Sequence, residues 1–175
     1  VGIICRLVRE KGLVEFLNAA KNIKKKYPKV TFLVIGERLP SDYDKNVNKE
    51  LEEAKIKLNE SLKILGERND IRELLGLMDL FCLPSWREGM PRTIIEAMMM
   101  GKPVIGTNIR GSRELIIHKK TGLILPVKNE NKLKCGIEFF IRNKNKCKTY
   151  GLNGFKIARK NHDEDKIVSK QINLI

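Results

Sequence analysis

Apolar residues along the chain form short runs that alternate with longer segments of helical periodicity. The runs are rich in Val, Ile and Leu and end at Gly or at polar residues, as buried strands do; they cover residues 1–5, 30–35, 61–65, 80–83, 103–105 and 123–125. Between them, apolar residues three or four positions apart predict helices over residues 12–26, 49–58, 70–78, 91–100 and 112–117, followed by a helical tail.

This alternation predicts the fold class. Strands that are apolar along nearly their whole length and alternate with helices are typical of a parallel sheet covered on both faces, so we expect a doubly wound, Rossmann-like α/β fold. The 175 residues suit one domain, 1–175, and no internal repeat or Gly/Ser-rich linker divides them. Because the chain starts inside the first expected strand and without Met, we expect a longer protein with a missing N-terminal domain.

Composition excludes several classes of protein. Hydrophobic residues make up 42% and charged residues 32%, which excludes intrinsic disorder and low-complexity proteins. The first residues lack the basic start and cleavage site of a signal peptide, and no apolar run is long enough to span a membrane, so we expect a soluble, cytoplasmic protein. Four widely spaced Cys and two His indicate neither a metal site nor a disulfide framework, and favour a reducing compartment.

The formal net charge of +14 favours an anionic partner. Nucleic acid, an anionic membrane surface and phosphorylated ligands all satisfy it, as does a plain solvated lysine face. Nucleic-acid readers usually interleave aromatic with basic residues, and only 6% of this chain is aromatic. Nucleic acid is therefore the less favoured partner.

Ligands of open α/β sheets bind at the carboxyl ends of the strands, so the residues after each run are candidates. Arg6 and Lys11 lie in the loop after the first run. As fixed cationic donors they can hold a diphosphate and stabilise the charge that develops on it. The alternative is a pair of solvated bases near a helix start.

A second candidate site spans the loop and helix after the fourth run. Pro91 suits the first helical position, which leaves the N–H groups of Arg92 and Thr93 directed at a phosphate. Glu88 before the helix and Glu96 inside it can each accept hydrogen bonds from vicinal hydroxyls. A ligand with phosphate at its centre and hydroxyls at both ends, such as a nucleotide sugar, fits this chemistry. The alternative is a loop acid near a helix start and an exposed helix glutamate.

Several motifs occur in one order along nearly the whole chain. They are R-L-x-x-E-K-G at 6–12, the two glutamates with Ala97-Met98, G-K-P-V-I-G-T at 101–107, G-S-R-E at 111–114 and T-G-L at 121–123. This set resembles the C-terminal, donor-binding domain of the retaining family-four glycosyltransferases of GT-B fold. Family members often carry Gly where this chain has Arg110, and an aliphatic residue or Asn where it has Arg92, which leaves the donor open.

The resemblance implies a nucleotide-sugar substrate, such as a UDP- or GDP-sugar, and no cofactor or divalent metal. It implies catalytic roles for three residues, with the diphosphate contacted by Arg6 and Lys11 and the donor sugar by Glu88. Glu96 would hold the ribose hydroxyls. The remaining donor-binding positions would be Gly89, Met90, Pro91 and Thr93 around the phosphates and sugar, and Arg68, Asn69 and Ile71 against the base.

The resemblance also implies partners. The tail, residues 155–175, would cross to the missing N-terminal domain, and the acceptor would be lipid-linked or a growing surface polysaccharide, so the enzyme could sit peripherally on the inner face of the membrane. The alternative is a non-catalytic basic Rossmann-like module that binds nucleic acid or anionic surfaces.

Three other features are open to more than one interpretation. Trp86 either walls the donor pocket or packs its own loop. The run 98–100 of three Met is expected in the core, and His118 in a turn.

Overall fold

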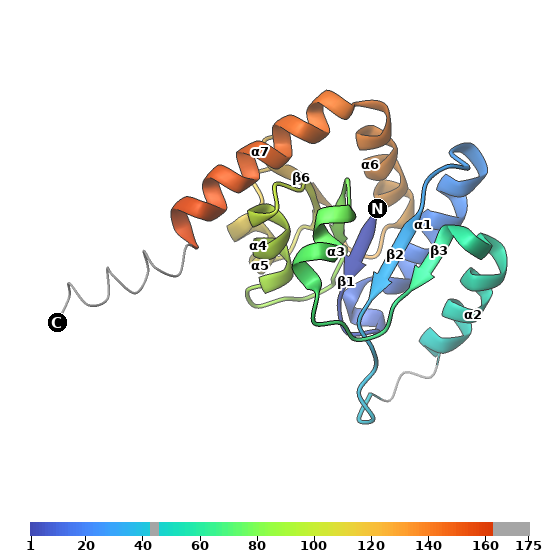
Figure 1. Ribbon diagram of the computed structural model, residues 1–175. Helices are drawn as coiled ribbons and strands as arrows, with labels where there is room; N and C mark the ends of the chain where they lie inside the picture. The colour runs from blue at the N-terminus through green and yellow to red at the C-terminus, as the bar shows by residue number, and fades with distance from the viewer. Residues whose placement is uncertain (43–45, 163–175) are drawn as a thin grey trace.

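The computed structural model describes residues 1–42 and 46–162, which form one six-stranded parallel sheet (Figure 1). The strand order is β3-β2-β1-β4-β5-β6. From β1 the chain builds one half of the sheet through β2 and β3, and it then returns to the other side of β1 to build β4, β5 and β6. Every predicted strand is present: β1 Gly2–Ile4, β2 Phe32–Ile35, β3 Leu62–Ile64, β4 Phe81–Leu83, β5 Val104–Thr107 and β6 Gly122–Leu125. The Rossmann-like prediction is confirmed.

The predicted helices are also present, with small differences at their ends. They are α1 Leu13–Lys26, α2 Asn46–Leu58, α3 Ile71–Leu77, α4 Arg92–Met99 and α5 Arg110–Leu115, and the tail forms α6 Glu130–Arg142 and α7 Lys144–Asn161. Single 3-10 turns cover Arg9–Lys11 and Asn59–Ser61. No helix in the described part of the chain is long and apolar enough to cross a bilayer.

The start of α4 differs from the prediction by one residue. Pro91 was expected as the first helical residue, but it has ψ 100° and the helix begins at Arg92. The carbonyl of Pro91 accepts the first helical hydrogen bond, from Ile94 N at 3.0 Å. Pro91 is therefore the N-cap residue, because its carbonyl accepts the first hydrogen bond of the helix while its own backbone is extended.

Each face of the sheet buries its own core. On one face, Phe16, Phe32 and Cys82 are fully buried in a cluster to which α1, α2 and α6 contribute. On the other face, Phe81 and Ile94 are fully buried in a cluster to which α3, α4, α5 and α7 contribute. A strand buried on both faces needs apolar residues at every position, which explains the continuous apolar runs.

Helix α7 contributes to both cores and lies along the outside of the molecule (Figure 1). Tyr150 is buried in the first core and Ala158 in the second. A Cβ on Gly151 would lie 2.0 Å from the carbonyl oxygen of Gly101, so α7 rests directly on the backbone of the turn after α4. Residues 155–161 of the predicted tail thus belong to α7, and residues 163–175 lie outside the described residues.

Candidate functional site

The loop after β1 is held against the end of β4 by a glycine. Gly12 ends the 3-10 turn with φ +71°, a left-handed conformation that glycine adopts at low cost. A Cβ at this position would lie 2.1 Å from the carbonyl oxygen of Pro84. The loop also accepts a backbone hydrogen bond of 2.7 Å from Trp86 N to Glu10 O. The two carboxyl-end loops, far apart in sequence, are therefore packed together.

This packing brings Lys11 into contact with Glu88, two of the residues predicted to be catalytic. Lys11 Nζ donates to Glu88 Oε1 at 2.7 Å, and the two side chains are 25% and 12% exposed. Ser85 Oγ donates to the same oxygen at 2.8 Å. Among the described residues no donor contacts Glu88 Oε2, so this oxygen is available to a ligand.

The loop that carries Glu88 is fixed from the other side by α5. A Cβ on Gly111 would lie 2.1 Å from Gly89 O and 2.9 Å from Glu88 O, so the first turn of α5 rests on the loop backbone. Gly89 and Met90 are nevertheless exposed, while Pro91 is buried. The loop is thus held at its base with its tip exposed. Thr93, in the first turn of α4, is half-buried.

Arg6 lies at a separate groove of about 330 Å³ between the ends of β1 and β2 and the turn after β3. Its guanidinium is 3.5 Å from the carboxylate of Asp42. Arg68 lines the same groove and makes two hydrogen bonds of 2.7 Å to Asp70, which hold the pKa of that carboxyl below its usual value. The groove therefore has two guanidinium groups, each oriented by an acid.

Cys5 also lines this groove. Burial raises the pKa of its thiol to about 12, with Lys11 lowering and Glu88 raising it. Burial therefore favours the protonated thiol over the thiolate.

Glu96 faces a larger cavity of about 860 Å³ between α3, α4 and the end of α7. Asn69 and Ile71, predicted to lie against a base, line the same cavity. Ile71 also lines the groove of Arg6, so the two hollows adjoin at this residue. The cavity is mixed in character, with apolar and basic lining residues that include Ile95, Met99, Met100, Arg72, Phe155, Arg159 and His162.

The structure thus brings the predicted residues together in three adjoining groups. Lys11 meets Glu88, Arg6 shares a groove with Arg68, and Glu96 shares a cavity with Asn69. Lys11 and Glu88 line neither hollow. In the described part of the chain, no three His, Cys, Asp or Glu side chains come together as metal ligands would.

The three features with more than one interpretation, which are Trp86, the Met run 98–100 and His118, have structural roles. Trp86 donates from Nε1 to Glu15 at 3.0 Å and lies under Lys128, whose Nζ is 4.2 Å from the ring centroid, so it packs its loop against α1. Met98 is buried in the core, as predicted, whereas Met99 and Met100 are half-buried and line the cavity of Glu96. His118 accepts a hydrogen bond of 3.0 Å from Ile124 N through Nδ1 and holds a turn, also as predicted.

Sequence reasoning missed two residues that position the site, Ser85 and Asp42. Ser85 directly follows β4 at the carboxyl edge, and this position was a usable signal. Asp42 lies in a long loop after β2, and nothing in the sequence pairs it with Arg6.

A profile of the glycosyl transferases group 1 family matches residues 1–157. The chain belongs to this family. Its GT-B relatives include the Escherichia coli UDP-Gal:alpha-D-GlcNAc-diphosphoundecaprenol alpha-1,3-galactosyltransferase, to which it is 31% identical over 99% of this chain and 45% of the relative.

Solved structures of group 1 glycosyltransferases agree with this assignment. Anabaena HepE in complex with UDP superposes with a TM-score of 0.86 at 27% identity, over 99% of this chain and 48% of that one. The C-terminal domain of a Francisella tularensis group 1 protein, solved by itself, matches with a TM-score of 0.81 at 26% identity, over 92% of this chain and 84% of that domain. The chain thus spans under half the length of the two full relatives and corresponds to the C-terminal domain.

Proposed function

We propose that this chain is the donor-binding half of a glycosyltransferase that takes a sugar from a nucleoside diphosphate and transfers it, with retention, to a lipid-linked saccharide. The observation that carries the proposal is the half-buried contact of Lys11 with Glu88 at the carboxyl edge. It supports the proposal because a cation able to bind a diphosphate lies beside an acid able to accept from a sugar hydroxyl. HepE, which binds UDP and UDP-glucose, and the E. coli relative, whose acceptor is a diphosphoundecaprenol, support the two substrate classes.

The roles follow from the geometry of each group. Arg6 and Lys11 neutralise the diphosphate, whose negative charge increases as the glycosyl bond breaks. Glu88 holds Lys11 through Oε1 and accepts from a sugar hydroxyl through Oε2. Because the loop is fixed by Gly111, these groups need little rearrangement when the donor binds.

The nucleoside end of the donor would bind in the cavity of Glu96. Its carboxylate accepts from two vicinal ribose hydroxyls, and Asn69 and Ile71 contact the base. Gly89, Met90 and Thr93 would contact the phosphates and the sugar of the donor. We expect the reaction to need no divalent metal and the acceptor to be held by an N-terminal domain.

Calorimetric titration with UDP, GDP, ADP and the matching sugar nucleotides tests these roles. Glu96→Ala should weaken the nucleotide itself by about tenfold to a hundredfold, the range of charge-assisted hydrogen bonds. Glu88→Ala should chiefly weaken the intact sugar donor. Arg6→Ala and Lys11→Ala should weaken both, and chelator should change nothing.

Matched controls separate a binding role from a general effect. Glu114→Ala removes another exposed helix glutamate, and Arg142→Ala another exposed arginine, outside both hollows. Neither should change nucleotide affinity. Absence of binding by every nucleoside diphosphate would refute the proposal, and equal losses in the Glu88 and Glu96 variants would refute the division of roles.

A further inference from the structure

Positive charge is concentrated in the last third of the domain. Residues 112–162 contain thirteen Lys and Arg against three Asp and Glu, whereas residues 1–111 contain twenty against fifteen. Helix α7 alone has six Lys and Arg and no acid. Six of these thirteen cations thus lie on one helix at the outside of the molecule.

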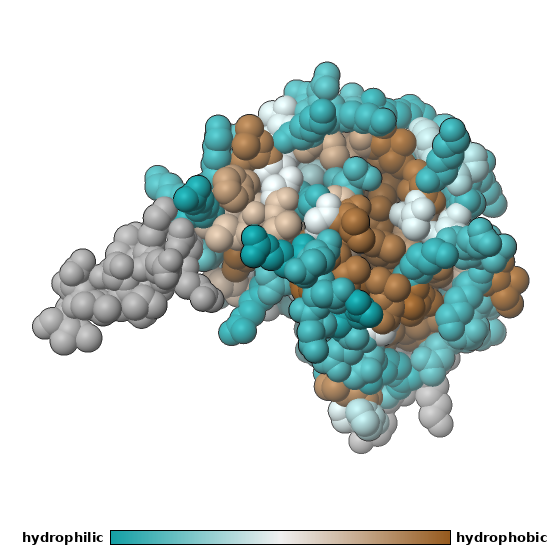
Figure 2. Space-filling view, in the orientation of Figure 1, coloured by the Kyte–Doolittle hydropathy of each residue, from teal (hydrophilic) through white to brown (hydrophobic). Residues whose placement is uncertain are grey.

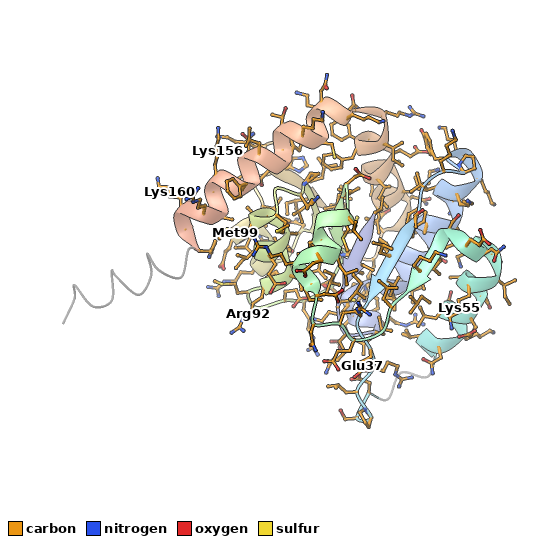
Figure 3. All side chains as sticks on the ribbon, viewed as in Figure 1. Glu37, Lys55, Arg92, Met99, Lys156 and Lys160 are labelled. Carbon is orange, nitrogen blue, oxygen red and sulfur yellow. The ribbon has the colours of Figure 1, made fainter. Side chains whose placement is uncertain are left out.

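The outward face of α7 presents this charge as one surface. Lys148, Leu152 and Lys156 follow each other at intervals of four residues, so they lie in one row along the helix. Both lysines are exposed, and Leu152 between them is 53% exposed. Figure 3 shows Lys156 and Lys160 pointing away from the body of the molecule, and the rim that α7 forms is mostly hydrophilic in Figure 2.

The turn before β6 extends the row sideways. Asn153 of α7 donates to Lys120 O at 3.0 Å, which fixes the turn beside the helix. Lys119 and Lys120 are exposed there. Four lysines and one apolar residue therefore share a surface, called here the α7 basic surface: Lys119, Lys120, Lys148, Leu152 and Lys156.

These lysines differ from the other lysine cluster of the chain. At the end of α1, Lys24 bonds to Pro28 O and Ser61, and Lys26 lies 3.5 Å from Glu138. Within residues 1–42 and 46–162, no carboxylate lies within ion-pair distance of the four lysines of the α7 basic surface. Their charge is consequently available to a partner outside the chain.

We propose that the α7 basic surface docks on an anionic lipid bilayer. Several lysines around an exposed leucine suit lipid headgroups with shallow apolar contact, and no member of the surface is an aromatic residue on which a nucleic-acid base could stack. The diphosphoundecaprenol acceptor of the E. coli relative is a membrane lipid, which favours a bilayer as the partner.

Docking through α7 would also place the donor site near the membrane. The last turns of α7 line the cavity of Glu96 through Phe155 and Arg159. The same helix therefore carries the lipid-facing lysines and part of the wall of the nucleotide cavity. Membrane docking goes beyond donor binding, and either can fail without the other.

Flotation of the 175-residue chain with vesicles tests the proposal, since a related C-terminal domain has been solved by itself. Vesicles of equal parts phosphatidylglycerol and phosphatidylcholine should bind the chain, and phosphatidylcholine alone should not. Replacing the four lysines with Gln should weaken binding about a hundredfold or more, because each lysine near an anionic surface contributes about fivefold. Leu152→Gln should weaken it severalfold.

The control removes the same charge elsewhere. Gln at Lys49, Lys55, Lys57 and Lys63, on α2 and β3 at the opposite edge of the sheet, should leave most of the vesicle affinity intact. UDP affinity should stay unchanged in both fourfold variants. If the chain without substitutions does not bind UDP, the proposed donor site is wrong, but the proposed membrane docking is not affected. Equal loss of vesicle binding in the two variants, or tighter binding to duplex DNA than to anionic vesicles at the same salt, would overturn the proposal.

Discussion

The cations at the carboxyl edge of the sheet and the cations on α7 differ in what holds them. Lys11, Arg6 and Arg68 each have an acid within 3.5 Å, supplied by Glu88, Asp42 and Asp70. The α7 helix has no acid of its own. A cation held by a nearby carboxylate is fixed in direction, which suits a small ligand with two phosphates. Flexible lysines on a helix act through their summed field, which suits a large charged surface.

The strongest way to break this comparison is to move the loop that fixes Glu88. Gly111→Ala would place a Cβ 2.1 Å from Gly89 O, and overpacking of this kind costs about 1–3 kcal/mol. We expect a clear drop in the melting temperature and loss of donor binding, with vesicle binding retained in the folded protein.

Gly76→Ala is the matched control for Gly111→Ala. The nearest atom to its Cβ would be Met100 Cε at 3.9 Å, and the position is exposed in a helix. It should be neutral or stabilise by up to about 1 kcal/mol. If both variants lose stability equally, α5 does not rest on the loop as described.

The second prediction concerns the pair of Lys11 and Glu88. Breaking a fully buried pair costs about 3–5 kcal/mol, and this pair is partly exposed, so Lys11→Met should cost about 1–2 kcal/mol in the free energy of unfolding. A double-mutant cycle with Glu88→Gln, measured by urea unfolding, should show coupling between the two positions. Additive losses would mean that the acid does not hold the lysine in solution.

Salt should separate the two groups of cations. Raising the ionic strength from about 0.1 M to 1 M shortens the Debye length from about 10 Å to 3 Å. Vesicle binding through the exposed lysines should then disappear, while UDP affinity should fall by a smaller factor because Lys11, the proposed contact of the diphosphate, is only 25% exposed. Parallel titrations at several salt concentrations measure both, and equal salt slopes would contradict the distinction.

The smallest effect is expected at Arg68 and Asp70, which are both exposed. Arg68 lowers the pKa of the Asp70 carboxyl through their hydrogen bonds. A lowered folded pKa stabilises the protein above the unfolded pKa, and that contribution is lost as the pH falls through the folded value. NMR titration should show the Asp70 pKa rising toward its ordinary value in Arg68→Gln. No change in pKa would mean that the pair is not formed in solution.

Much of the fold could be predicted from the sequence because a sheet buried on both faces leaves a strong local pattern. Runs such as 30–35 and 80–83 are apolar at nearly every position, and each is a strand in the structure. The start of α2 was predicted three residues late, since its first turn follows a long loop and has little apolar periodicity.

The site was only partly predictable, for a different physical reason. Reading the carboxyl ends of strands located Lys11 and Glu88, which the structure joins. The contact of Gly111 with the loop, the partner of Arg6 and the cavity beside Glu96 depend on packing between elements far apart in sequence. No local pattern encodes such distances. The roles assigned to these residues stay predictions until ligands are titrated.

Helix α7 contacts the turn after α4 directly through backbone atoms, and this contact has a consequence for packing. Gly151 meets Gly101 without an intervening side chain, and a Cβ on Gly154 would lie 3.5 Å from Met98 Cγ of α4. These two glycines let α7 approach α4 and the turn after it more closely than larger residues would allow. A larger residue at Gly151 would therefore displace α7 from its seat beside α4, the helix that carries Glu96.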